Sequence, residues 1–240
     1  MASEQLHGFD TADLTRKFEA KPSKGEASLP SEGIDNKRLF LISRSTSKTN
    51  EATRNRKNVS FSDEVSFNGK KYRVNSAKSG LYREILSRLI AQFEIATIKW
   101  QRLFVLRFDL HTKTYTEDNK QITAFRKRLF QRLKRTYGVK QIGFCWVREM
   151  ERSKSQHYHW VIFIDGNLIR HSGRINKIIK ECWEDGSDNY HVPIIKNPYY
   201  FGTKEQISED VIYRISYLAK ARGKGYRSSQ AKDYQTSRLK

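Results

Sequence analysis

Two histidines one residue apart, His157 and His159, lie in an alternating stretch of polar and apolar residues that is typical of a β-strand. Successive side chains of a strand point to opposite faces of a sheet, so both imidazoles are expected on one face and Tyr158 and Trp160 on the other. Two imidazoles at this spacing can bind a divalent cation. The simpler interpretation is a histidine pair without a metal, and the rest of the chain decides between the two.

A metal held by two histidines needs a further protein ligand, and a strand expected over 142–151 offers Glu149 and Glu151. Directly paired residues of an antiparallel hairpin point the same way. An odd-length link of about five residues would therefore place Glu149 opposite His159 and Glu151 opposite His157. An even link would turn both carboxylates away. We favour Glu149, which is further from the frayed strand end. Two fallback ligands lie on an earlier strand: Asp109 and His111.

A helix expected over 205–221 carries the second group of reactive side chains. At about 100° per residue, Tyr213, Tyr217 and Lys220 fall on one stripe. The opposite stripe is apolar and contains Ile207, Val211, Ile215 and Leu218. Tyrosines at helical spacing usually serve packing, but their position opposite the apolar stripe favours another role. A tyrosine phenolate can attack phosphorus while a metal polarises the phosphodiester and a lysine neutralises its charge. Such a reaction stores the bond energy in a phosphotyrosine, so the strand can be rejoined without ATP.

The composition points to a polyanionic partner. The chain has 240 residues, a formal net charge of +20 and only two cysteines. So large a charge favours nucleic acid. Cys145 and Cys182 lie in apolar stretches, as expected of core residues in a reducing compartment. No stretch approaches 18 apolar residues and no signal peptide is recognised, so we expect a cytoplasmic protein without a membrane partner.

The chain divides into three regions. Residues 1–60 are polar and predict a largely disordered arm. Asn68-Gly69 predicts a hairpin within 61–77. Residues 78–240 alternate helical and strand patterns and predict one domain.

The order of elements in this domain predicts an α+β fold. After a helix that starts near Ser79, the expected elements are strand 102–111, helix 117–137, strands 142–151 and 156–165, helix 168–183, a short edge strand from 191 and helix 205–221. The order is that of the split βαβ, ferredoxin-like plan. We expect a four- or five-stranded antiparallel sheet with two helices on one face. The other face is expected to be open for a site, with the tyrosine-bearing C-terminal helix near it.

Four motifs, taken in order, carry a family resemblance. They are Arg107-Phe-Asp-Leu-His111, Trp146-Val-Arg-Glu149, His157-Tyr-His159 and Tyr213-Arg-Ile-Ser-Tyr-Leu-Ala-Lys220. From about Leu81 to Leu239 the chain resembles the inovirus-type, or YagK/YfjJ-like, replication proteins of filamentous phages and prophages. That family resembles a branch of the His-hydrophobic-His (HUH) endonucleases, which start rolling-circle replication. The resemblance implies a nick at a phage origin, a 5′-phosphotyrosyl intermediate, a 3′-OH primer, and Mn²⁺ or Mg²⁺.

The resemblance also implies residue roles. His157, His159 and Glu149 would bind the metal, Tyr217 would be the nucleophile of a Tyr-x-x-Lys motif, and Lys220 would be its basic partner. Tyr213 leaves a two-tyrosine scheme open. Between the histidines, Tyr158 is bulkier than the aliphatic residue common in the wider superfamily, although it fits this branch.

The implied partners are single-stranded or supercoiled origin DNA and, in the bacterial host cell, a host helicase and the replication machinery. The chain has no phosphate-loop motif for a helicase of its own. The competing interpretations are a non-catalytic DNA-binding regulator, an HUH transposase or relaxase, and an RNA-binding module. The last would need exposed aromatic side chains on the open face, where histidines and carboxylates are expected instead.

Overall fold

The computed structural model describes residues 58–150, 156–184, 190–225 and 231–240, all within a compact unit that spans residues 37–240. Almost all of the predicted N-terminal arm, Glu151 and the predicted hairpin link at 152–155 lie outside the described residues. Within the part that is described, no helix combines the length and the apolar character that crossing a membrane requires.

The centre of the fold is an antiparallel sheet with the strand order β10-β6-β7-β5-β8, and β9 also pairs with β5. Its strands are β5 (Leu103–Thr112), β6 (Gly143–Glu149), β7 (His157–Asp165), β8 (Tyr190–His191), β9 (Tyr199–Gly202) and β10 (Tyr234–Thr236). The predicted strands form β5 to β8, and β8 lies at an edge, as Pro193 indicated. The short strands β9 and β10 were not predicted, so the sheet has six strands among the described residues and not four or five.

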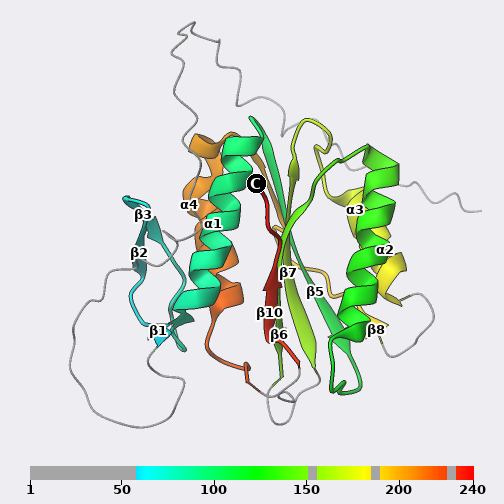
Figure 1. Ribbon diagram of the computed structural model, residues 1–240, viewed down its shortest axis with the longest axis horizontal. Coiled ribbons are helices and arrows are strands. Elements are labelled where there is room, and N and C mark those ends of the chain that lie inside the picture. The colour runs from blue at the N-terminus through cyan, green and yellow to red at the C-terminus, as the bar shows by residue number, and fades with distance from the viewer. Residues whose placement is uncertain (1–57, 151–155, 185–189, 226–230) are drawn as a thin grey trace, which may run out of the picture. The chain divides into compact units, whose positions relative to one another are not determined.

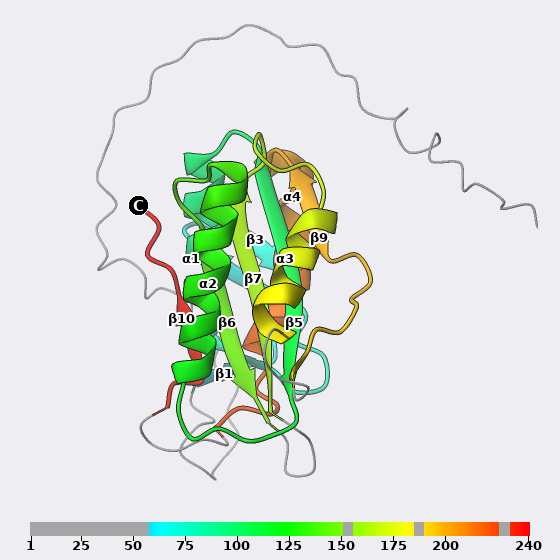
Figure 2. The same ribbon diagram turned by 90° about the vertical axis from the view of Figure 1, so that its right-hand side faces the viewer.

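Helices cover both faces of this sheet, as Figures 1 and 2 show. One layer contains α2 (Lys120–Tyr137) and α3 (Gly173–Glu184), and the other contains α1 (Arg83–Lys99) and α4 (Lys204–Ile215). The prediction of an α+β fold is confirmed, but the prediction of one open face is wrong. The reason is that the strands are apolar on both faces over half of their length, and α1 and α4 bury the second apolar surface.

The face beneath α2 and α3 is apolar over most of its length, and at one end the buried Arg148 lies opposite Tyr158 and donates to Gln156 Oε1 at 2.7 Å. Tyr158, Trp160, Ile162 and Ile164 all point into it, as the alternation of the strand predicted. Trp160 stacks on Phe108 of β5 with 5.6 Å between ring centroids. This tightly packed aromatic layer holds β7 in place and fixes the opposite direction for His157 and His159.

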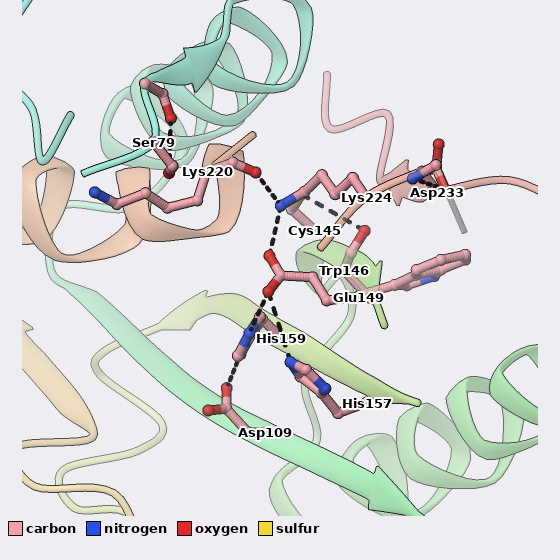
Figure 3. Close-up of polar contacts among 12 residues, drawn as sticks. Ser79, Asp109, Cys145, Trp146, Glu149, His157, His159, Lys220, Lys224 and Asp233 are labelled. Atoms are coloured by element: carbon pink, nitrogen blue, oxygen red, sulfur yellow. Dashed lines mark hydrogen bonds and ion pairs between the residues drawn. The ribbon is translucent and has the colours of Figure 1, made fainter. Parts of the chain in front are cut away.

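The face beneath α1 and α4 changes character halfway along the strands. At one end it is apolar, with Val105, Cys145, Val161 and Phe163 in the core. At the other end the same face carries Arg107, Asp109, Glu149, His157 and His159. The polar end lies where helix coverage gives way to the segment after α4, and it contains the candidate site (Figure 3).

A hairpin packs beside this second helix layer. It contains β2 (Glu64–Phe67) and β3 (Lys70–Arg73), joined by Asn68 and Gly69, whose φ angles are 47° and 76°. Positive φ at both positions is what a type I′ hairpin turn requires. The hairpin places Val65, Phe67 and Tyr72 in the same core as α1 and α4. A further short pair is formed by β1 (Val59–Ser60) and β4 (Leu81–Tyr82).

Candidate metal centre

Glu149 on β6 and the two histidines on β7 meet because of the strand register. Glu149 pairs with His157, and Val147 pairs with His159. The link between the paired residues runs from 150 to 156, seven residues, so its length is odd as the same-face arrangement requires. The register differs by two residues from the prediction, which had placed Glu149 opposite His159. All three side chains nevertheless point to one face.

The side-chain atoms that could bind a metal converge closely. One ligand atom from each of Glu149, His157 and His159 lies within 4.8 Å of the others. Glu149 Oε2 lies 3.2 Å from His159 Nε2 and 3.6 Å from His157 Nε2 (Figure 3). Two imidazoles and one carboxylate are a suitable donor set for a divalent transition metal. The three residues therefore form a cluster that could hold a metal ion.

Outer contacts fix the orientation of two of these ligands. Asp109 pairs with His159 across β5 and β7, and its Oδ1 lies 2.7 Å from His159 Nδ1. A hydrogen bond donated by Nδ1–H leaves Nε2 as the metal-binding nitrogen. Lys224 Nζ lies 2.5 Å from Glu149 Oε1, so the other oxygen, Oε2, faces the histidines. Asp109, one of the two fallback ligands, thus supports a ligand and is not a member of the cluster itself.

The charges in the site are strongly coupled. Burial raises the pKa of Glu149, but hydrogen bonds from His157 and His159 and the charge of Lys224 outweigh it and hold this pKa far below its ordinary value. Burial disfavours the charged form of His159, yet the hydrogen bonds to Asp109 and Glu149 raise its pKa overall. Without a metal, the site therefore favours a carboxylate beside a protonated His159.

His111, the other fallback ligand, lies next to this cluster. It pairs with His157 across β5 and β7, with 5.3 Å between ring centroids. On its other side it pairs with His191 of β8, at 6.5 Å. Burial and the neighbouring charge of His157 lower the pKa of His111. Within the described part of the chain, His111 is not a member of the three-residue cluster.

Tyr217 lies directly against the cluster. Its ring meets that of His159 edge to face, with 5.1 Å between the ring centroids. The Arg107 guanidinium lies 4.6 Å from the centroid of the Tyr217 ring. Burial, followed by the negative charge of Glu149, raises the pKa of the Tyr217 phenol, while Arg107 and Arg222 oppose this effect. The phenol is therefore protonated at neutral pH unless a further positive charge acts on it.

Tyr213 and Lys220 lie elsewhere, so the predicted shared stripe is wrong. The α-helix ends at Ile215, and Ser216–Ala219 form a 3₁₀ turn, which rotates successive side chains by about 120° instead of 100°. Tyr213 is 39% exposed and packs under Arg73. Lys220 donates to Asn75 Oδ1 at 3.0 Å and to the carbonyl of Ala77, and Figure 3 shows its side chain extending away from Glu149. Only Tyr217 of this group reaches the site.

Two site residues were not predicted, Arg107 and Lys224. Arg107 could have been found, because it alternates with Asp109 and His111 on one face of β5. Lys224 follows the helical segment in a loop where Gly223 and Gly225 have φ angles of 75° and 90°. No periodic pattern predicts the direction of a side chain in such a loop. Gly223 also lies close to Glu149, whose Cβ would be 3.4 Å from a side chain added there.

The fold and the site together define an α+β protein with a candidate metal cluster and an adjoining tyrosine. Residues 63–233 match the family model described as the YagK/YfjJ C-terminal domain. The chain therefore belongs to this family, as its motifs predicted. No curated protein and no solved structure matched the chain significantly.

Proposed function

We propose that this protein is a phage or prophage replication initiator of the HUH type, which nicks origin DNA and joins itself to the cut strand through Tyr217. The observation that carries the proposal is the contact between the Tyr217 ring and His159 of the candidate metal cluster. A nucleophile next to a cation-binding cluster is the arrangement that phosphodiester cleavage requires.

The strand order supports the same assignment. Without the short strands β8 and β10, the order β6-β7-β5-β9 is that of the split βαβ plan, with both histidines on a central strand. The two neighbouring strands supply Glu149 and Asp109. The site is therefore built on strands of the sheet, which suits a cluster that must hold its geometry through a reaction.

The roles of the residues follow from their positions. Glu149, His157 and His159 would hold Mn²⁺ or Mg²⁺, and such an ion supplies Lewis-acid polarisation of a phosphodiester when it is bound. Tyr217 Oη attacks phosphorus, the P–O3′ bond breaks, and its electron pair leaves with O3′. The phenol loses one proton and the departing O3′ gains one. The products are a 5′-phosphotyrosyl strand and a 3′-OH that can prime synthesis.

Lys220 is poorly placed for the role that its motif implies. Its ammonium is bound to Asn75 and Ala77, and Lys224 is the lysine that contacts the cluster, through Glu149. We therefore assign Lys220 to the support of the segment that carries Tyr217. The formal charge of +20 suits binding to single-stranded or supercoiled origin DNA in the cytoplasm of a bacterial host, where a host helicase would unwind the duplex.

A nicking assay tests the proposal. Supercoiled plasmid carrying the DNA that flanks the gene is incubated with the protein in Mn²⁺ or in EDTA, and denaturing gels reveal any protein–DNA adduct. We expect a nick and an adduct in Mn²⁺ but not in EDTA. Both should disappear in Tyr217→Phe and remain in the matched control Tyr213→Phe. Tight DNA binding with neither nick nor adduct would contradict the proposal and favour a DNA-binding regulator.

A further inference from the structure

Arg107 is a buried cation for which the reaction described above assigns no task. It lies on β5, two residues before Asp109, with its side chain 9% exposed. Its Nη2 lies 3.4 Å from Asp109 Oδ2, a long contact for a charged pair. Its Nε–H is buried and has no hydrogen-bond partner among the residues that the structure describes. Such an unpaired donor is costly unless a ligand completes it.

The guanidinium also lies against the candidate nucleophile. Its central carbon lies 4.6 Å from the centroid of the Tyr217 ring, and the same ring contacts His159. Tyr217 is thus flanked by a potential metal ligand and by a cation. A group that reacts with Tyr217 would therefore meet the positive charge of Arg107, which favours an anion.

A second arginine adds to the positive charge around Arg107. Burial lowers the pKa of Arg107, Asp109 opposes this, and the charge of Arg214 on α4 lowers the pKa further. Arg214 donates to the carbonyl of Lys196 at 2.9 Å, and its own Nε has no hydrogen-bond partner in the described part of the chain. Two carboxylates act on Arg107, Asp109 and Glu149, and Asp109 is shared with His159. Within the described residues, Arg107 and Arg214 therefore both keep a buried Nε–H without a partner, and a phosphate oxygen is a suitable acceptor for such a donor.

We propose that Arg107 is a phosphate-binding residue that donates its unpaired Nε–H to a non-bridging oxygen of the phosphodiester attacked by Tyr217. This inference rests on the proposed function, because it names the part of the DNA that the site receives. Arg107 forms no covalent bond. Its planar group offers directional donors to the phosphate, and its stacking on the Tyr217 ring sets the distance between nucleophile and phosphorus.

A direct test observes the Arg107 Nε–H itself. The full chain is labelled with ¹⁵N, its arginine Nε–H signals are recorded by NMR in EDTA, and Arg107→Lys assigns the signal. Inorganic phosphate and then a single-stranded oligothymidylate are added. We expect both probes to shift the Arg107 signal. The matched control is Arg102, which precedes β5 and stacks on Phe201 at 4.4 Å, far along the strand from the histidines. The Arg102 Nε–H signal should not shift when either probe is added.

Failure of this test has a clear form. If the oligonucleotide moves other signals while the Arg107 Nε–H stays unchanged, Arg107 does not bind phosphate. That result would overturn the inference whether or not the protein nicks DNA. Conversely, the Arg107 signal could shift in a protein that never nicks DNA. That result would support phosphate binding by Arg107 and refute only the proposed nicking function.

Kinetics separate phosphate binding from simple support of the site. We expect Arg107→Gln to slow nicking by about 100-fold or more, the usual effect of removing one donor to a developing oxyanion. Its affinity for Mn²⁺ should stay within about twofold of the wild type, because Asp109 keeps its 2.7 Å hydrogen bond with His159 and meets Arg107 only at 3.4 Å. Arg102→Gln should change neither quantity. An equal loss of Mn²⁺ affinity and nicking in Arg107→Gln would instead mark Arg107 as a brace for Asp109 and overturn the inference.

Discussion

Replacing Lys224 by methionine removes the cation that holds Glu149 in place. The Lys224 side chain is 1% exposed and that of Glu149 is 6% exposed, and their charged atoms lie 2.5 Å apart. Methionine retains most of the volume of the lysine stem but leaves the carboxylate buried without this partner. Lys224 also donates to the backbone carbonyl of Lys220, so the loop after the 3₁₀ turn loses an anchor as well.

The expected loss is large because both groups are buried. Breaking a buried ion pair by removing one partner costs about 3 to 5 kcal/mol. His157 and His159 still contact Glu149, so we expect the lower end, about 3 kcal/mol. In a domain of this size that loss lowers the melting temperature by about 10 °C. Removing both charges in Lys224→Met with Glu149→Gln should restore most of the stability, since no unpaired charge is left.

Urea unfolding in EDTA, followed by circular dichroism, measures these free energies without bound metal. The matched control is Lys220→Met, which removes an ammonium bound to the neutral oxygens of Asn75 and Ala77 and should cost about 1 to 2 kcal/mol. The wild type, the two single variants and the double variant form a double-mutant cycle. Their free energies of unfolding give the coupling energy between Lys224 and Glu149.

Two results would refute this reasoning. One is a loss of less than 1 kcal/mol in Lys224→Met, which would mean that water reaches the pair. The other is a double variant that is less stable than Lys224→Met, which would mean that the coupling is not electrostatic. Either result would remove the basis for treating Lys224 as the residue that orients Glu149.

Two further predictions concern the same face of the sheet. Asp109→Asn should weaken Mn²⁺ binding by about 10- to 100-fold, because the carboxylate that orients His159 through Nδ1 is lost; isothermal titration calorimetry measures this, and an unchanged affinity would refute the role of Asp109. Burial raises the pKa of the Cys145 thiol from its ordinary value of 9.0 to about 12. The unfolded chain therefore ionises first, so this stabilising contribution is complete below pH 9 and is lost as the pH rises towards 12. Over that window the free energy of unfolding should fall by about 1.4 kcal/mol per pH unit more steeply in the wild type than in Cys145→Ala. Equal slopes in the two proteins would show that the thiol is not sequestered.

The central strands were predictable because their alternation is strong and local. The same alternation gave the face of His157 and His159, and the odd length of the hairpin link was enough to bring Glu149 to that face. The exact register was not predictable. An odd link length fixes which face the paired side chains share, but it allows registers that differ by two residues. Helix coverage of both faces was missed since periodicity shows that a surface is buried without showing which element buries it.

The sequence predicted some residues of the site and missed others, because motifs identify residues without giving the direction of their side chains. Tyr217 was identified by its motif, although the 3₁₀ turn that directs it to His159 overturned the helical geometry assumed for Tyr213 and Lys220. The support from Lys224 depends on a loop that passes close to Glu149 at Gly223, and sequence patterns carry no direction for such segments. The phosphate-binding role proposed for Arg107 depends on an unpaired buried donor, which is visible only once the side chains around it are placed in the fold.

The most direct test of the central claim is to map the covalent adduct. The protein is reacted with origin DNA in Mn²⁺, digested with nuclease and protease, and the phosphonucleotide-bearing peptide is sequenced by mass spectrometry. We expect the modification on Tyr217, none on Tyr213, and no adduct in EDTA. An adduct on Tyr213, or a nicked product with a 5′-phosphate and no protein attached, would contradict this expectation.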